Sequence, residues 1–201
     1  PRRFGKSLLL STLAEIFSGN KELFKGLWIY DKIQWKQYPV IHLDFSQTDY
    51  KSPEALEKSL ENRIERVAAK HSVQLNPKYV LKEKFAELLE KLGEKQKVVI
   101  LIDEYDKPMT EYIEKEDILK AQQIRSVLKD FFVVIKASDK FLRFVFITGV
   151  SKFSKVSVFS DLNNLRDITL SSQFSTLLGY TQSELMKYFE PFIAQLAVEI
   201  G

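Results

Sequence analysis

The chain has 201 residues, with 30 Lys and Arg against 27 Asp and Glu, a formal net charge of +3, and 45% apolar residues. These values are typical of one globular domain with a buried core, and the charge is too small to indicate nucleic-acid binding. The chain has no Cys and only 2 His, which excludes disulfides, thiolate metal sites and multi-His metal sites. No apolar run approaches the roughly 20 residues that span a bilayer, so we expect a soluble, cytoplasmic protein.

Residues 1–7, Pro-Arg-Arg-Phe-Gly-Lys-Ser, match the second half of the phosphate-binding pattern G-x-x-x-x-G-K-[ST]. In such a loop, Lys6 reaches the β- and γ-phosphates and the Ser7 hydroxyl ligates Mg²⁺. The apolar residues 8–17 predict the helix whose N-terminus faces the anion. The residues expected to bind the nucleotide are Arg3, Phe4, Gly5, Lys6 and Ser7. The leading Gly of the pattern, and the strand before it, would precede Pro1, so we expect a fragment truncated at both ends.

Residues 39–45 predict a strand, in which His42 is expected to be a core residue. Asp44 and Ser46, at its carboxyl end, are expected to cap a turn. Ser52 followed by Pro53 predicts a helix start. A further helix is predicted over residues 81–92 and is expected to stop at Gly93.

Residues 98–104 are five apolar residues followed by Asp103 and Glu104. The continuous apolar run favours a strand buried on both faces of a parallel sheet, and ligands bind at the carboxyl ends of such strands. This arrangement matches a Walker B motif. Asp103 would hold Mg²⁺, directly or through water, and Glu104 would polarise the attacking water as the catalytic base.

Predicted helices and strands also alternate along the rest of the chain. A long helix is predicted over residues 119–135, a strand over 143–148 and a short strand over 167–170. Thr181 and Glu184 form a capping box that opens a last helix, expected to be kinked or broken near Pro191. The alternation predicts an α/β fold with a mostly parallel sheet flanked by helices. With no repeat or linker, residues 1–201 are interpreted as one domain.

The order of the elements also bears on the class of P-loop protein. A strand (residues 39–45) lies in sequence between the P-loop helix and the Walker B strand. This order is expected when an extra strand separates the Walker A and Walker B strands in the sheet, as in ATPases with a catalytic Glu beside the Walker B Asp. A nucleoside or metabolite kinase is therefore the weaker interpretation.

Five motifs together resemble the predicted AAA-ATPase-like family over nearly the whole chain: residues 1–8, 101–106 (Leu-Ile-Asp-Glu-Tyr-Asp), 148–153 (Thr-Gly-Val-Ser-Lys-Phe), 159–164 (Phe-Ser-Asp-Leu-Asn-Asn) and 179–181 (Gly-Tyr-Thr). The resemblance implies ATP binding with Mg²⁺, and hydrolysis. Family members are mostly bacterial and often carry a PD-(D/E)XK nuclease-like domain after the ATPase region. Such a domain would be the partner in the same chain, and nucleic acid would be reached only through it.

The remaining candidate residues are open to two interpretations each. Thr148 ends a strand beside Walker B and is predicted to be a catalytic sensor of the attacking water, with Ser151 as the alternative. Asp106 follows the acidic pair, although a helix cap before Pro108 explains it equally well. Arg166 is a weak candidate for an arginine finger, which would act on a neighbouring subunit if the protein forms an oligomer. A solvated loop residue is the alternative.

Two functions remain in competition. The first is an ATP-driven switch or motor domain, an ATP phosphohydrolase that acts on an attached domain; Glu104 favours it. The second is a scaffold or interaction module that holds nucleotide without hydrolysing it; the Arg-rich loop and the lack of a clear arginine finger favour it. A nuclease activity of the chain itself is disfavoured, because Glu104-Tyr-Asp-Lys107 lacks the (D/E)-x-K spacing that puts both groups on one strand face.

Overall fold

The computed structural model describes residues 4–114, 117–150 and 165–200. The structure divides into two compact units, one comprising Ser7–Leu165 and a smaller one comprising Pro1–Lys6 with Arg166–Gly201. The predicted interpretation of residues 1–201 as one domain is not tested by this division and stays a prediction.

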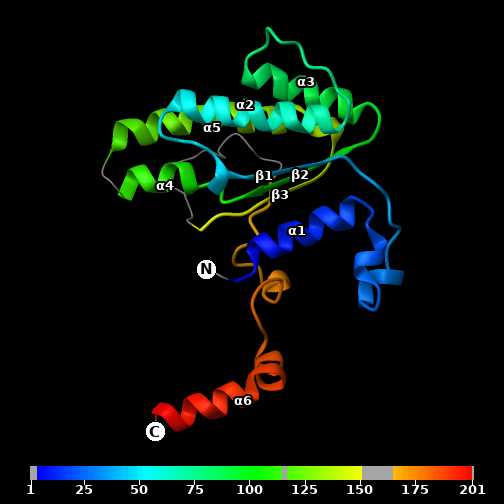
Figure 1. Cartoon of the computed structure of the whole chain (residues 1–201), viewed down its shortest axis with the longest axis vertical. Helices are drawn as coiled ribbons and strands as arrows, with labels where there is room; N and C mark the ends of the chain where they lie inside the picture. The colour runs from blue at the N-terminus through cyan, green and yellow to red at the C-terminus, as the bar shows by residue number, and fades with distance from the viewer. Residues whose placement is uncertain (1–3, 115–116, 151–164, 201) are drawn as a thin grey trace. The chain divides into compact units, whose positions relative to one another are not determined.

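A parallel sheet organises the larger unit (Figure 1). Among the described residues it has three strands, β1 (Val40–Asp44), β2 (Val98–Asp103) and β3 (Leu142–Ile147), in the order β1-β2-β3. Both neighbours of β2 run parallel to it. The three strands lie within one residue of the ranges that the sequence predicts. The short strand predicted over residues 167–170 does not form, because this segment is irregular and ends in a turn.

The central strand is covered on both faces, which explains its uninterrupted apolar sequence. All six residues of β2 are buried. Val98, Ile100 and Ile102 belong to one apolar cluster, whereas Val99 and Leu101 belong to another. Since side chains alternate along a strand, the two sets point to opposite faces of the sheet.

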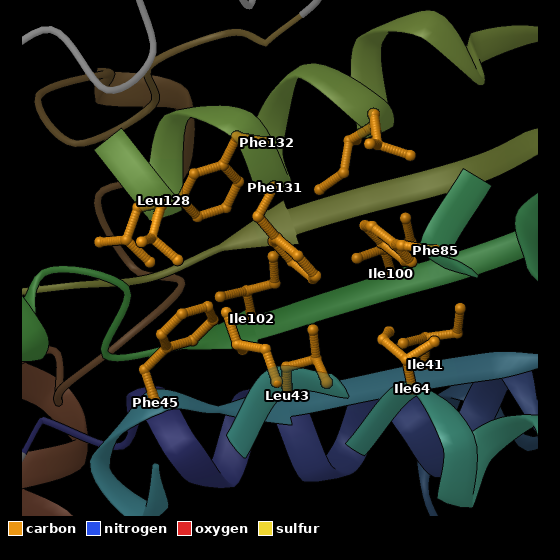
Figure 2. Close-up of a cluster of buried hydrophobic side chains, with 14 of the residues drawn as sticks. Ile41, Leu43, Phe45, Ile64, Phe85, Ile100, Ile102, Leu128, Phe131 and Phe132 are labelled. Atoms are coloured by element: carbon orange, nitrogen blue, oxygen red, sulfur yellow. The ribbon is translucent and has the colours of Figure 1, made fainter. Parts of the chain in front are cut away.

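One face of the sheet is covered by α2 (Pro53–Lys70), α3 (Leu81–Gly93) and α5 (Ile118–Ala137) (Figure 1). The crossovers from β1 to β2 and from β2 to β3 run in the same direction with the same hand, so their helices share a face. Aromatic rings fill the space between these helices and the sheet (Figure 2). Phe85 and Phe131 stack with their centroids 4.3 Å apart, and Phe45 lies against both Phe131 and Phe132.

The helix ends can be compared with the start and stop signals in the sequence. The predicted start of α2 is confirmed, since the Ser52 hydroxyl accepts a hydrogen bond from the backbone N–H of Ala55 at 3.1 Å. Gly93 is indeed the last residue of α3, and it has a second property that the sequence does not reveal. A Cβ at this position would lie 2.4 Å from the Cβ of Phe141, so Gly93 permits a close approach between segments.

The opposite face of the sheet carries α1 (Lys6–Phe17) (Figure 1). Its buried Leu10 clusters with Val99 and Leu101, and Phe17 packs against Phe144 with ring centroids 5.2 Å apart. Short 3-10 turns connect the main elements: η1 (Lys21–Phe24), η2 (Trp28–Asp31), η3 (Phe45–Gln47), η4 (Asp139–Phe141) and η5 (Ser172–Phe174). A short helix, α4 (Lys107–Glu114), follows β2 and packs against α5 and η3.

The smaller unit contains α6 (Gln182–Ile200). Its predicted capping box is confirmed: the Thr181 N–H donates to Glu184 Oε2 at 2.8 Å, and the Glu184 N–H donates to the Thr181 hydroxyl at 3.3 Å. α6 continues through Pro191 as one helix, so the predicted break is wrong, while the alternative of a kink stays a prediction. Within the described residues, no helix is both long enough and apolar enough to cross a membrane.

Candidate functional site

A polar cleft in the larger unit opens where β1 and β2 end, and elements from both faces of the sheet line it. Its volume is about 320 Å³. Side chains from α1, β1, η3, α2 and β2 line it: Ser7, Ser11, His42, Asp44, Gln47, Arg63 and Asp103. The cleft therefore brings together Ser7 and Asp103, two residues that the sequence predicts as ligands of one metal ion.

The N-terminal turn of α1 supplies one wall of the cleft. Gly5 precedes the helix with φ +87°, a left-handed conformation that only glycine adopts readily. Lys6 is the first residue of α1, and the exposed Ser7 hydroxyl has no hydrogen-bond partner in the described part of the chain. The Ser11 hydroxyl instead donates to the Ser7 carbonyl at 3.0 Å. A helix N-terminus carries a partial positive charge, which suits an anion.

Asp103 lies at the end of β2, with only 4% of its surface exposed. Its Oδ1 accepts two hydrogen bonds, from the Glu104 N–H at 3.0 Å and from the Thr148 hydroxyl at 2.5 Å. Its Oδ2 accepts none from the residues that the structure describes. Oδ1 of Asp103 is thus fixed, whereas Oδ2 remains available. The unbonded hydroxyl of Ser7 lines the same cleft.

This donor set fits a magnesium ion shared with a ligand. Mg²⁺ prefers oxygen donors and is usually held by one or two protein side chains together with phosphates and water. The Asp103 carboxylate and the Ser7 hydroxyl are donors of this kind. The described residues contain no group of three or more His, Cys, Asp or Glu that would hold a metal ion alone, so a metal here would need further oxygen ligands from a bound molecule.

Asp44 is the register partner of Asp103 on β1, but its carboxylate is already satisfied. Oδ1 accepts from the N–H and the hydroxyl of Ser46 at 2.9 and 2.7 Å, and Oδ2 accepts from Gln47 Nε2 at 2.7 Å. The prediction that Asp44 and Ser46 cap a turn is confirmed, because these bonds close η3.

Glu104 follows Asp103 with a backbone φ of +50°. The residue is partly buried, and its carboxylate is not among the groups that line the cleft. The pKa of the nearby Tyr50 is raised to about 12. The largest cause is burial, followed by the hydrogen bond to Glu111, and the negative charge of Glu104 makes a smaller contribution. The role of Glu104 as catalytic base stays a prediction.

The segment after β3 folds against the segment after β2. The Thr148 N–H donates to the Ile102 carbonyl at 2.8 Å, and the Tyr105 N–H donates to the Thr148 carbonyl at 3.1 Å. The buried Asp106 accepts a hydrogen bond from the Val150 N–H at 2.9 Å through Oδ2. The Asp106 side chain therefore reaches across to the neighbouring turn, and its role as a helix cap before Pro108 stays a prediction. Thr148 lies beside Asp103 with its hydroxyl donated to that carboxylate, and its catalytic role stays a prediction.

The sequence did not predict four residues of the cleft, Ser11, His42, Gln47 and Arg63. His42 is exposed and lines the cleft, so its assignment to the core is wrong. It alternates with the buried Ile41 and Leu43, and this period of two could have placed it on the α1 face with Asp44. Gln47 and Arg63 carry no sequence signal, because only the packing of η3 and α2 brings them to the cleft.

The remaining predicted residues belong to the smaller unit or fall outside the described residues. Arg3 and Ser151 fall outside the described residues. Phe4 lies in the smaller unit against Gly179, where an added Cβ would be 3.0 Å from its ring. Arg166, in the same unit, places its guanidinium 5.9 Å from the centroid of the Phe174 ring.

A parallel sheet flanked by helices, with a polar cleft at its carboxyl end, defines an α/β protein consistent with a P-loop-like fold. The chain belongs to the predicted AAA-ATPase family, whose model, described as "Predicted AAA-ATPase", matches residues 1–159. The family supports nucleotide binding in general terms.

A curated protein of Azotobacter chroococcum mcd 1, named "Uncharacterized protein in vnfD 5'region", is 40% identical to the chain over 197 residues. The match covers 95% of this chain and 37% of that protein, so the chain spans little more than a third of its relative. No solved structure matches the chain.

Proposed function

We propose that this chain binds ATP with Mg²⁺ and hydrolyses it, acting as a switch or motor for an attached domain. The observation that carries the proposal is the available Oδ2 of the buried Asp103, which shares a cleft with the unbonded hydroxyl of Ser7. Family membership supports nucleotide binding independently.

In this proposal the residues of the N-terminal loop bind the nucleotide. Arg3, Phe4 and Gly5 would contact the nucleotide, Lys6 would contact its β- and γ-phosphates, and the start of α1 would face their negative charge. Ser7 and Asp103 are the protein ligands of the metal ion. When bound, Mg²⁺ would offset the negative charge that develops on the phosphate oxygens.

Hydrolysis is assigned to Glu104 and water. The water oxygen bonds to the γ-phosphorus while the bond from that phosphorus to the bridging oxygen breaks, and its electron pair leaves with ADP. The proton of the water passes to Glu104 and then to solvent. Thr148 serves this reaction from beside Asp103. Most of the rate enhancement in such reactions comes from positioning and charge stabilisation.

The alternative is a domain that holds nucleotide without hydrolysing it. Two observations favour it: the Glu104 carboxylate is not among the cleft-lining groups, and the Thr148 hydroxyl is donated to Asp103 instead of facing the cleft. Nucleotide binding is common to both functions, so the two differ only in turnover.

Three finer features belong to the same proposal. An additional strand lies between the Walker A and Walker B strands; the pairing of both edges of β2 supports this, because it leaves β2 no edge for another strand. The attached domain is the nuclease-like domain that the family resemblance implies. An oligomer would supply the arginine finger.

The test is calorimetric titration of the full-length protein with ATP, with and without Mg²⁺. Lys6→Ala should weaken ATP binding at least 10-fold, because it removes the point charge at the phosphates. Lys25→Ala, at an exposed lysine between η1 and η2, is the matched control and should bind like the wild type. Equal affinity in the wild type and Lys6→Ala would show that the phosphates are not held by this loop.

A further inference from the structure

Glu104 has a backbone conformation that glutamate disfavours. Its φ of +50° is left-handed, and the other described non-glycine residue with positive φ is Ser72, at φ +55°. Ser72 follows α2, where a left-handed residue is a common way to end a helix. Glu104 instead follows a strand. Such a conformation persists only where the surrounding structure enforces it, and it is concentrated at active sites.

Hydrogen bonds on both sides of Glu104 enforce its conformation. Its N–H donates to Asp103 Oδ1, and its carbonyl accepts from the Lys107 N–H, both at 3.0 Å. The next N–H, that of Tyr105, donates to the Thr148 carbonyl at 3.1 Å. The turn from β2 into α4 is therefore fixed at its start and at its middle.

Asp106 fixes the end of this turn. With only 2% of its surface exposed, it is one of the most buried polar residues described. Its Oδ2 accepts from the Val150 N–H, while its carbonyl accepts from the N–H groups of Met109 and Thr110 in the first turn of α4. Asp106 thereby joins the turn after β2, the start of α4 and the segment after β3.

Gly149 permits this close packing. A Cβ at position 149 would lie 2.5 Å from the Tyr105 ring and 2.7 Å from Asp106 Oδ1. Any side chain would therefore push the segment after β3 away from the turn that holds Glu104.

The far side of α4 is tied to the segment after β1, so α4 cannot move to relax the turn. The Tyr112 hydroxyl donates to the Tyr50 carbonyl, and the Tyr50 hydroxyl donates to Glu111 Oε2, both at 2.8 Å. The segments that follow all three strands are thus connected around Glu104.

We propose that Asp106 is a positioning residue that holds Glu104 in its left-handed backbone conformation, the conformation from which Glu104 would accept the proton of the reacting water. This inference rests on the proposed hydrolytic function. Asp106 acts on the reaction through the backbone of residues 103–106 and 148–150, and not by contact with the substrate. Loss of its carboxylate frees the turn, and Glu104 then relaxes to a right-handed or extended φ that directs its side chain elsewhere.

The experiment measures ATP affinity and steady-state hydrolysis of the full-length protein. Asp106→Ala should lower kcat about 10- to 100-fold, the usual effect of a misaligned catalytic group, while ATP affinity and KM stay within about twofold. Asp106→Asn keeps an oxygen acceptor for the Val150 N–H and should recover most of kcat. Lys84→Met, which disturbs a buried charge between α2 and α3, controls for destabilisation and should keep its kcat.

A double-mutant cycle with Glu104→Gln separates positioning from a general effect on the fold. Because Asp106 acts through Glu104, Asp106→Ala should lower kcat no further in the Glu104→Gln background. Losses that multiply, or a raised KM with unchanged kcat, overturn the inference. The inference is also overturned if Glu104→Gln hydrolyses ATP at the wild-type rate.

The same measurements distinguish a failure of the proposed function from a failure of the inference about Asp106. A wild type that binds no nucleotide refutes both proposals. A wild type that binds ATP but hydrolyses none supports the non-hydrolysing alternative and overturns the role of Asp106, since there is then no reaction for Glu104 to serve. If Asp106→Ala binds and hydrolyses ATP like the wild type, the inference about Asp106 is refuted and the proposed function is not.

Discussion

The Thr148 hydroxyl donates a hydrogen bond to Asp103 Oδ1 at 2.5 Å and joins the end of β3 to the end of β2. Together with the Glu104 N–H, it occupies one carboxylate oxygen and leaves the other available. A side chain that orients a metal ligand in this way affects the metal affinity without contacting the metal.

Thr148→Val removes the donor and keeps the shape of the side chain. We expect the Mg²⁺ concentration for half-maximal ATP binding to rise about 10-fold, the usual cost of losing a partner behind a metal ligand. Thr148→Ser retains the hydroxyl and is the matched control. Fluorescence titration with magnesium at fixed ATP measures the effect; identical curves for the Val and Ser variants would contradict it.

Glu104→Gln keeps the size of the side chain and loses the basic carboxylate. ATP binding should persist, while single-turnover hydrolysis falls by roughly 10²- to 10⁴-fold, the usual contribution of a positioned base. Asp103→Asn should instead shift the magnesium dependence, because that carboxylate is the proposed ligand of the metal. Rapid-quench measurements at varied magnesium distinguish the two variants. If both behave alike, the division of roles between the acidic neighbours is wrong.

Gly149→Ala should destabilise the larger unit, because the new Cβ would lie 2.5 Å from the Tyr105 ring. Overpacking of this kind costs about 1–3 kcal/mol of unfolding free energy. Chemical denaturation followed by circular dichroism provides the measurement. Tyr105→Ala removes the ring and should recover part of the loss when combined with Gly149→Ala; purely additive losses would show that the ring is not the obstacle.

Lys84 is a buried ammonium between Glu61 and Glu65, whose oxygens both lie 2.6 Å away. Lys84→Ala should cost about 2–4 kcal/mol of unfolding free energy near neutral pH, because the carboxylates lose their shared partner. Lys82→Ala, on the same helix, breaks an exposed pair of 3.8 Å and should cost at most about 0.5 kcal/mol. Equal losses from the two variants would contradict the buried role of Lys84.

The cost of losing Lys84 should depend on pH in a defined direction. The hydrogen bond from Lys84, and then that from Lys58, lowers the pKa of Glu61 below its usual 4.5. The stabilisation is therefore complete above pH 4.5 and is lost as the pH falls through the lowered pKa, where the folded protein must also take up the proton. The difference in unfolding free energy between the wild type and Lys84→Met should shrink under these acidic conditions. A difference that grows on acidification would refute this assignment.

The main strands and helices could be predicted because their signals are local. The continuous apolar run of β2 indicates burial on both faces, and Ser52 with Pro53 marks a helix start that the structure confirms. The motif at the start of α1 and the acids after β2 predicted that Ser7 and Asp103 share a site, and both line one cleft.

The features that escaped prediction depend on contacts between distant segments. Asp106 was interpreted from its neighbours in sequence, whereas its carboxylate accepts from Val150 on another turn. Arg63 belongs to a helix whose sequence indicates only which side faces the core. No local pattern encodes either contact, because both arise from how the crossover segments return to the sheet.

The left-handed backbone of Glu104 has a consequence for sequence design. Glycine or asparagine would adopt its φ of +50° more readily, and relieving such a residue yields about 1 kcal/mol. A library selected for thermal stability alone would therefore enrich Gly or Asn at position 104. Selection for turnover would retain Glu, so comparing the two enrichments would show, without any assumption about the reaction, whether this position serves folding or chemistry.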